Sequence, residues 1–286
     1  MDGILIINKP KGYTSHDIVN VLRKKLNTKK IGHAGTLDPN ATGVLIALVG
    51  KATKLSKYLI EHDKVYIAKL KLGEEKDTGD ADGETICMED VEEISTPNIE
   101  ETLKSFLGKQ QQKPPKYSAI KINGKKAYEY ARQGQDVEIK PREIEIYDID
   151  LLNYSGNIIT FKVKCSKGTY IRTLCEDIAK RLNTVGYTLE LNRIKVDKFD
   201  IKDSIEIENL DNIEKIKEKL YPIEEILEEY QKIYLNQKYL KLFLNGVKLK
   251  KEEQDGVYTI YYNNNLIATG VIEKGILKRD ICFQEI

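Results

Sequence analysis

Residues 32–43 read GHAGTLDPNATG, a stretch in which glycine and proline supply four of the twelve residues. Asp38 stands in it between a leucine and a proline. An aspartate before proline is held out of the helical region, and its carboxylate can accept hydrogen bonds from backbone N–H groups two residues on. The residues alone therefore leave two interpretations of Asp38 open, a turn-forming residue or a functional carboxylate.

The segments around this loop alternate between strands and helices. GILIINKP (3–10), GVLIALVG (43–50), KVYIAKLKLG (64–73) and FKVKCS (161–166) are apolar or alternating, which is typical of strands. A helix is expected over 14–26, where Thr14 can cap the N-terminus with Asp17 three residues on. A second helix is expected after Tyr170, with Arg172 off its apolar stripe. Since no βα period repeats, we expect a mixed α/β (α+β) fold with a largely antiparallel central sheet.

A boundary is predicted near the end of an acidic segment that covers residues 200–232. Beyond it, FLNGVKL (243–249), GVYTIYYNNNLIATGVI (256–272) and GILKRDICF (275–283) are interpreted as short strands joined by Asn and Gly turns. The sequence thus predicts a catalytic domain over 1–232 and a small β-rich domain over 233–286.

Composition favours a globular protein of the cytoplasm. The chain has 286 residues, 41% of them hydrophobic, which is enough for a sizeable core. Its four cysteines form no C-x-x-C pair and no His lies at metal spacing, so we expect reduced thiols, no disulfide framework and no metal. No stretch reaches the roughly 18 apolar residues of a membrane span, and no leader is recognised at the start.

Charge is segregated along the chain although the formal net charge is only +1. Residues 1–60 hold ten Lys or Arg and three acids, residues 102–128 hold seven Lys and no acid, and residues 200–230 hold eleven acids and four Lys. Two basic stretches of this kind are compatible with a phosphate backbone on one side of the molecule. A solvated surface produces similar runs, so charge alone does not decide.

Familiar catalytic motifs do not account for the loop. In the segment that ends VGKAT, Leu45 and Ala52 occupy positions where a P-loop needs Gly and Ser or Thr. The chain has no G-x-S-x-G nucleophile elbow. Acid–base chemistry by paired carboxylates stays open, because the sequence does not show a partner for Asp38.

Five ordered segments resemble the successive motifs of the TruB family of tRNA pseudouridine synthases. They are GILIINKPKGYTSHDIV, GHAGTLDPNATGVL, DKVYIAKLKLGEEKDTGDADG, YSAIKINGKKAYEYARQG and CSKGTYIRTLCEDIA, and the resemblance runs from about residue 3 to 195. The tail resembles, more weakly, the PUA-like domain of bacterial members. One departure is LELNRIKVDKF, where the family pattern has two arginines after the leucine and this chain has Asn192 and Arg193.

The resemblance assigns roles to eight residues. Asp38 falls on the family nucleophile, Arg172 on the arginine that pairs with it, and Tyr66 on the tyrosine that stacks on the target base. The other five fall on substrate-binding positions: Tyr170 and Leu191 on contacts to the flipped uracil, His33 on the ring that replaces the extruded base, and Lys9 and Asp80 on positions that support the loop or the RNA backbone. A carboxylate nucleophile suits an isomerisation that breaks an N-glycosidic bond and forms a C–C bond. Attack at the ribose C1′ and attack at the uracil C6 both remain open.

The resemblance implies an enzyme that isomerises uridine 55 in the T-loop of tRNA, without a cofactor. It also implies a monomer that binds the tRNA T-arm without an obligate protein partner or a membrane. The alternative from another class is a non-catalytic tRNA-binding or tRNA-folding protein of the same fold. The intact set of Asp38, Tyr66 and Arg172 favours the enzyme, because burying an ionised carboxylate without a role is costly.

Overall fold

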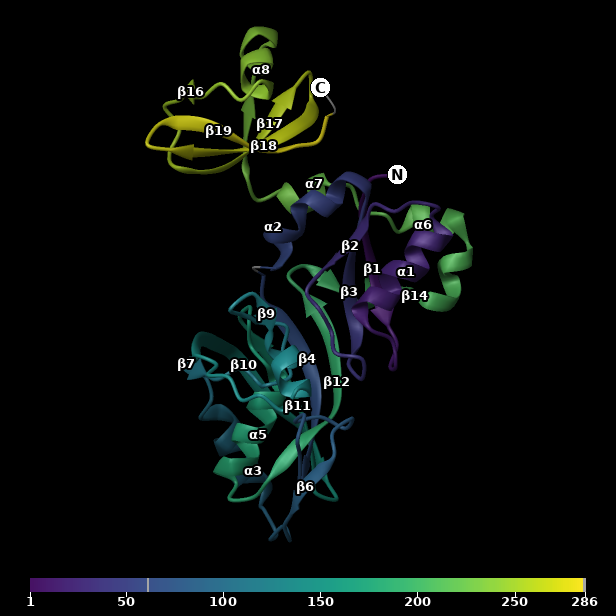
Figure 1. Ribbon diagram of the computed structural model, residues 1–286, viewed down its shortest axis with the longest axis vertical. Helices are drawn as coiled ribbons and strands as arrows, with labels where there is room; N and C mark the ends of the chain where they lie inside the picture. Colours follow the sequence, from purple (N-terminus) through teal and green to yellow (C-terminus); the bar gives the residue numbers. More distant parts are fainter. Residues whose placement is uncertain (61, 285–286) are drawn as a thin grey trace.

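The computed structural model describes residues 1–60 and 62–284. Figure 1 shows an elongated molecule with three lobes: a lower lobe, an adjoining lobe that holds the N-terminus, and a separate curled sheet at the C-terminal end. The first two lobes share one sheet of ten strands. All but two of its strand pairs are antiparallel, which confirms the predicted mixed fold with a largely antiparallel sheet.

The N-terminal lobe is built on strands β1, β2 and β3. Its elements are β1 (Gly3–Lys9), α1 (Ser15–Lys25), β2 (Ile31–Ala34), β3 (Thr42–Val49), the 3-10 helix η1 (Gly50–Leu55), α2 (Ser56–Ile60) and β14 (Ile205–Glu206). Helix α1 begins where the sequence predicts it, because Thr14 accepts from the backbone N–H of Asp17 and Asp17 accepts from that of Thr14. Its apolar stripe packs on one face of this half-sheet.

The lower lobe holds the other half of the sheet. Its elements are β4 (Lys64–Leu72), β5 (Glu74–Lys76), β6 (Thr85–Met88), α3 (Thr96–Lys104), β7 (Gly108–Gln112), β8 (Lys121–Ile122), β9 (Lys125–Lys126), α4 (Ala127–Arg132), β10 (Arg142–Ser155), β11 (Ile158–Cys165), α5 (Ile171–Arg181) and β12 (Gly186–Val196). The end of β12 and the short strand β13 (Phe199–Asp200) that pairs with it pack in the core of the N-terminal lobe. The alternating side chains of β4, Tyr66 to Leu72, and the apolar stripe of α5 form its main core, as the sequence predicts.

The two half-sheets meet where β12 runs parallel to β3, with Asn192 opposite Thr42 and Arg193 opposite Gly43. The backbones approach closely there. A Cβ atom on Gly43, whose φ is +100°, would lie 2.2 Å from the carbonyl oxygen of Arg193, so only glycine fits. The loop that contains Asp38 enters β3 directly before this junction and therefore lies between the two lobes.

The acidic segment links the shared sheet to the tail. It contains the 3-10 helices η2 (Ile201–Asp203) and η3 (Ile207–Asp211) and helices α6 (Ile213–Glu218) and α7 (Glu224–Leu227).

The tail forms a second sheet of five strands in the order β15-β17-β18-β19-β16. Its elements are β15 (Gln231–Tyr234), α8 (Gln237–Leu244), β16 (Leu249–Lys250), β17 (Gly256–Tyr262), β18 (Asn265–Glu273) and β19 (Ile276–Cys282). The strands expected over 256–272 and 275–283 are present. The strand expected over FLNGVKL is wrong: Phe243 and Leu244 end helix α8, which Asn236 caps, and only Leu249 enters a strand.

Candidate active site at the junction of the two half-sheets

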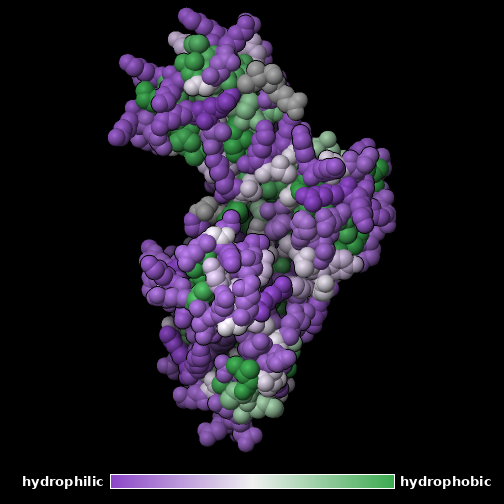
Figure 2. All heavy atoms as spheres, viewed as in Figure 1, coloured by the Kyte–Doolittle hydropathy of each residue, from purple (hydrophilic) through white to green (hydrophobic). Residues whose placement is uncertain are grey.

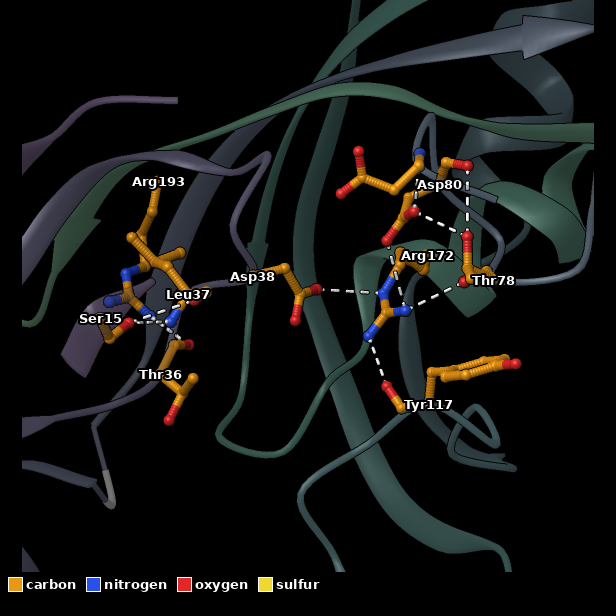
Figure 3. A network of polar contacts seen from close by, with 10 residues as sticks. Ser15, Thr36, Leu37, Asp38, Thr78, Asp80, Tyr117, Arg172 and Arg193 are labelled. Atoms are coloured by element: carbon orange, nitrogen blue, oxygen red, sulfur yellow. Dashed lines mark hydrogen bonds and ion pairs between the residues drawn. The ribbon is translucent and has the colours of Figure 1, made fainter. Parts of the chain in front are cut away.

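An ion pair between Asp38 and Arg172 crosses the space between the lobes. The Nε of Arg172 lies 3.1 Å from Oδ2 of Asp38. Asp38 comes from the loop before β3 and Arg172 from the first turn of α5, so the two lobes each contribute one partner (Figure 3). The Arg172 side chain is 6% exposed, whereas that of Asp38 is 41% exposed. The arginine is thus fixed in the protein while its partner keeps an accessible face.

Arg172 is held by further acceptors (Figure 3). Its Nη1 donates to the carbonyl of Thr78 at 2.9 Å and its Nη2 to the carbonyl of Tyr117 at 2.8 Å. A second carboxylate, that of Asp80, lies 3.4 Å from Nη1. A planar guanidinium with all three nitrogens engaged has little freedom to rotate. It therefore presents its Nε edge to Asp38 in a defined direction.

Asp80 is itself fixed. Its Oδ1 accepts from the Thr78 hydroxyl at 2.7 Å and from the backbone N–H of Asp82 at 3.1 Å. A short bridge pairs Asp80 with Thr188 of β12, where the N–H of Thr188 donates to the carbonyl of Gly79. The loop after β5 is thereby attached to the strand that carries Leu191.

The site raises the pKa of Asp38. Partial burial is the main cause, since desolvation disfavours the carboxylate, and the Asp80 charge adds to it. The Arg172 cation opposes both effects and favours the ionised form. The pKa of this carboxyl is therefore set by a balance in which Arg172 is the largest influence that keeps it charged.

A small hollow opens beside the ion pair. Asp38, Asp80, Arg172, Thr188 and Leu191 line it. Leu191 also packs against the core of the lower lobe. The hollow combines a carboxylate nucleophile candidate, a cation and an apolar wall.

Two tyrosines from the predicted set lie around this region. Tyr66, on β4, is buried, and burial raises its hydroxyl pKa while the Arg193 guanidinium opposes that rise. Tyr170 directly precedes α5; its N–H donates to the Gln112 side chain at 2.8 Å and its carbonyl accepts from the same amide at 3.0 Å. Arg142 lies 5.9 Å from the centre of the Tyr170 ring. Gln112 thus fixes the backbone that leads into Arg172.

His33 and Lys9 lie on the N-terminal side of the Asp38 loop. His33 is on β2, and its Nδ1 is buried with no hydrogen-bond partner among the residues that the structure describes. Burial and the nearby Arg193 lower its pKa, which favours a neutral ring. Lys9 is fully buried, and its ammonium donates to the carbonyls of Pro10, Tyr13 and Pro39. In this arrangement Lys9 supports the loop and is not open to an RNA backbone.

The departure at Asn192 lies on β12, next to Arg193. In the register of β12 and β4, Asn192 is opposite Ile67 while Arg193 is opposite Tyr66, so the two side chains project from opposite faces of the sheet. Arg193 is on the face of Tyr66 and is almost completely buried. A side chain at position 192 therefore projects from the face opposite to Tyr66 and Arg193.

Several residues of this site escaped the sequence prediction. Thr78 and Tyr117 act through backbone carbonyls, which leave no side-chain signal. Ser15 contacts Leu37 beside the nucleophile candidate, and a signal for it existed: Ser15 lies at helical spacing with Ile18, Val19 and Leu22, as a polar residue on an apolar stripe.

The fold has a match among solved structures. The chain overlays a structure described as an H/ACA RNP bound to a substrate RNA containing 2′-deoxyuridine with a TM-score of 0.73. That alignment covers 99% of this chain and 85% of the other at 23% identity, which shows the common fold.

The family follows from the sequence comparisons. Residues 23–171 match the model of the TruB family pseudouridylate synthase N-terminal domain. A protein of Clostridium kluyveri named tRNA pseudouridine synthase B is 44% identical over 93% of both chains. One of the same name from Alkaliphilus oremlandii is 46% identical over 94% of this chain and 86% of its own. The chain belongs to the TruB family.

Proposed function

We propose that this protein isomerises a uridine in the T-loop of tRNA, uridine 55, to pseudouridine, with Asp38 as the nucleophile. The observation that carries the proposal is the pair of Asp38 and Arg172 beside the hollow. The relatives named tRNA pseudouridine synthase B support the substrate and the reaction. The TruB family match over residues 23–171 supports the reaction class.

The reaction breaks the bond between uracil N1 and ribose C1′, forms one between C5 and C1′, releases the C5 proton to a base or to water, and leaves N1 carrying a proton taken up from solvent. The Asp38 carboxylate attacks either C1′ or C6, and its bond to that carbon breaks again before the product leaves. Arg172 keeps the free carboxylate ionised and oriented. Product and substrate are isomers, so the chemistry needs no redox step and no cofactor. Within residues 1–60 and 62–284, no group of three or more His, Cys, Asp or Glu side chains could hold a metal ion.

The remaining predicted residues have roles around the flipped base. Tyr66 stacks on the uracil close to its C5 proton, and Tyr170 and Leu191 enclose it. His33 fills the space that the base leaves in the T-loop, because extruding a base costs stacking that a flat ring can replace. Asp80 acts through Arg172, and Lys9 supports the loop.

The surface is suited to a polyanion. Six of the seven lysines between residues 102 and 128 are exposed. Figure 2 shows hydrophilic side chains over most of the visible face of all three lobes. None of the described helices is long and apolar enough to cross a membrane. We assign the lysine-rich segment 102–128 to contacts with the RNA backbone, and we expect the single chain to act without a protein partner.

The test is Asp38→Asn, assayed by tritium release from C5-labelled uridine in an unmodified tRNA transcript. The amide keeps the shape of the carboxylate and removes its nucleophilicity, so turnover is lost while tRNA binding persists. Asp211→Asn, on the exposed surface and paired with Lys25, is the matched control and keeps full activity. A transcript with cytidine at the target position reports the background.

Residual tritium release within about tenfold of wild type in Asp38→Asn would reject the nucleophile. A wild-type protein that binds tRNA tightly and releases no tritium would instead support the alternative, a tRNA-binding protein without catalysis.

A further inference from the structure

The loop that carries Asp38 is held through its backbone. It is irregular, yet every carbonyl from Gly35 to Pro39 accepts a hydrogen bond. Arg193 donates to those of Gly35 and Thr36, the Ser15 hydroxyl to that of Leu37, the N–H of Ala41 to that of Asp38, and Lys9 together with the N–H of Gly12 to that of Pro39. Five consecutive carbonyls are therefore satisfied, and three of the donors are buried side chains from elsewhere in the chain.

Arg193 joins the loop to the sheet. Its Nη2 lies 2.9 Å from the Gly35 oxygen, its Nη1 3.5 Å from the Thr36 oxygen, and its Nε 2.8 Å from the Val44 oxygen on β3. Figure 3 shows this guanidinium on the side of the loop away from Arg172. The side chain is 1% exposed, and no ion pair joins it to a carboxylate within the part of the chain described here. A buried charge is costly unless its donors are satisfied, and here carbonyl oxygens of the loop and of β3 satisfy them.

Ser15 joins the loop to helix α1. Its hydroxyl accepts from the N–H of Leu37 at 2.9 Å and donates to the carbonyl of the same residue at 3.1 Å. The Ser15 hydroxyl thus engages both the N–H and the carbonyl of Leu37, as a residue on a neighbouring strand would. Because Ser15 is the first residue of a capped helix, the backbone next to Asp38 is attached to a rigid element.

We infer that Ser15 and Arg193 are positioning residues that hold the backbone leading into Asp38, so that its carboxylate meets the reacting carbon and Arg172 at the same time. The inference rests on the proposed function. A substitution that loosens the loop displaces the Asp38 carboxylate and removes no contact with the RNA. A displacement of about 1 Å can cost roughly a hundredfold in rate.

The experiment uses the full chain with Ser15→Ala, Arg193→Lys and Arg193→Met. The matched controls are Ser204→Ala, whose hydroxyl also donates to a backbone carbonyl, and Arg23→Lys, whose guanidinium donates to the carbonyl of Ile31. We measure the single-turnover rate of tritium release at saturating tRNA, the tRNA dissociation constant by filter retention, the melting temperature, and hydrogen exchange of residues 35–41.

Ser15→Ala is expected to lower the saturated rate by about 10- to 100-fold, with an unchanged dissociation constant and faster exchange of the loop. Arg193→Lys, which keeps the charge but offers a single donor point, is expected to retain more rate than Arg193→Met. Both controls keep the wild-type rate.

Three results would overturn the inference. They are a wild-type saturated rate in folded Ser15→Ala, a loss confined to the dissociation constant, and an equal rate loss in the controls. A wild-type protein without tritium release would instead reject the proposed function, which separates the two failures.

Discussion

Arg172 favours the ionised form of Asp38 and also fixes the direction of its carboxylate. Burial raises the pKa of Asp38 and the Arg172 cation lowers it, so removing the cation leaves a higher pKa. A carboxyl with a higher pKa takes up its proton at higher pH, and the protonated form cannot attack. The acid limb of the rate profile should therefore shift to higher pH in Arg172→Gln and shift much less in Arg172→Lys, which keeps a charge.

Both variants also lose the guanidinium that contacts Asp38 through Nε while the Thr78 and Tyr117 carbonyls hold its other two nitrogens. We expect Arg172→Lys to lower the single-turnover rate by about two orders of magnitude, roughly 3 kcal/mol of transition-state stabilisation. The measurement is tritium release across the pH range, with Arg23→Lys as the control. Near-normal rates in Arg172→Lys would show that this side chain serves the fold and not the nucleophile.

His33 allows a separate test of base flipping. Its Nδ1 has no hydrogen-bond partner among the described residues, and its lowered pKa favours the neutral ring. A ring that stacks and a ring that transfers a proton should respond differently to substitution and to the folding of the RNA loop. If the ring replaces the flipped base, His33→Ala should damage activity on the folded T-arm far more than on a hairpin with an opened loop, where unstacking costs less. His33→Phe should recover part of the loss, since stacking needs only a flat face.

Rates on both hairpins decide this point. Equal losses on folded and open loops, with no recovery in His33→Phe, would reject stacking and favour a proton transfer at this position.

At the scale of elements, prediction worked where local chemistry is sufficient. The capping box of Thr14 and Asp17 marks the start of α1, and the alternation of β4 marks its buried face, because both signals lie within one element. The strand predicted over FLNGVKL is wrong because a short apolar run fits a helix as well as a strand. Asn236, seven residues before Phe243, caps a helix that buries Leu240 and Phe243.

The arrangement of the elements escaped prediction for a different reason. The parallel pairing of β12 with β3 joins residues about 150 positions apart, and it creates the place where Arg193 reaches the Asp38 loop. No local pattern reports such a pairing. The family motifs identified Asp38 and Arg172 as candidates, but the acceptors around them, mostly backbone carbonyls, appear only in three dimensions.

On the scale of the whole molecule, the tail sits on the N-terminal lobe through a defined interface. Asp280 of β19 pairs with Lys57 at 2.5 Å and accepts from the Tyr58 hydroxyl at 2.7 Å, while Lys54 donates to the carbonyl of Cys282. Phe283 is buried in the core of that lobe. Because deleting the tail would expose this core, point substitutions on its surface test its role more cleanly than truncation.

We propose that the tail, which begins near residue 233, binds the tRNA backbone away from the T-loop. Three exposed lysines in and near the edge strand β16 are the candidates: Lys248, Lys250 and Lys274. Replacing all three by alanine should weaken binding of full-length tRNA and flatten its dependence on salt, by roughly 0.7 to 0.9 in log–log slope for each phosphate that the variant no longer neutralises. The saturated rate on an isolated T-arm hairpin should not change, since the reacting groups lie in the other two lobes.

The control replaces three exposed lysines of the acidic segment: Lys215, Lys217 and Lys219. A slower saturated rate on the hairpin in the tail variant alone would mean that the tail shapes the active site, and an unchanged salt slope on full-length tRNA would mean that it does not touch the RNA there.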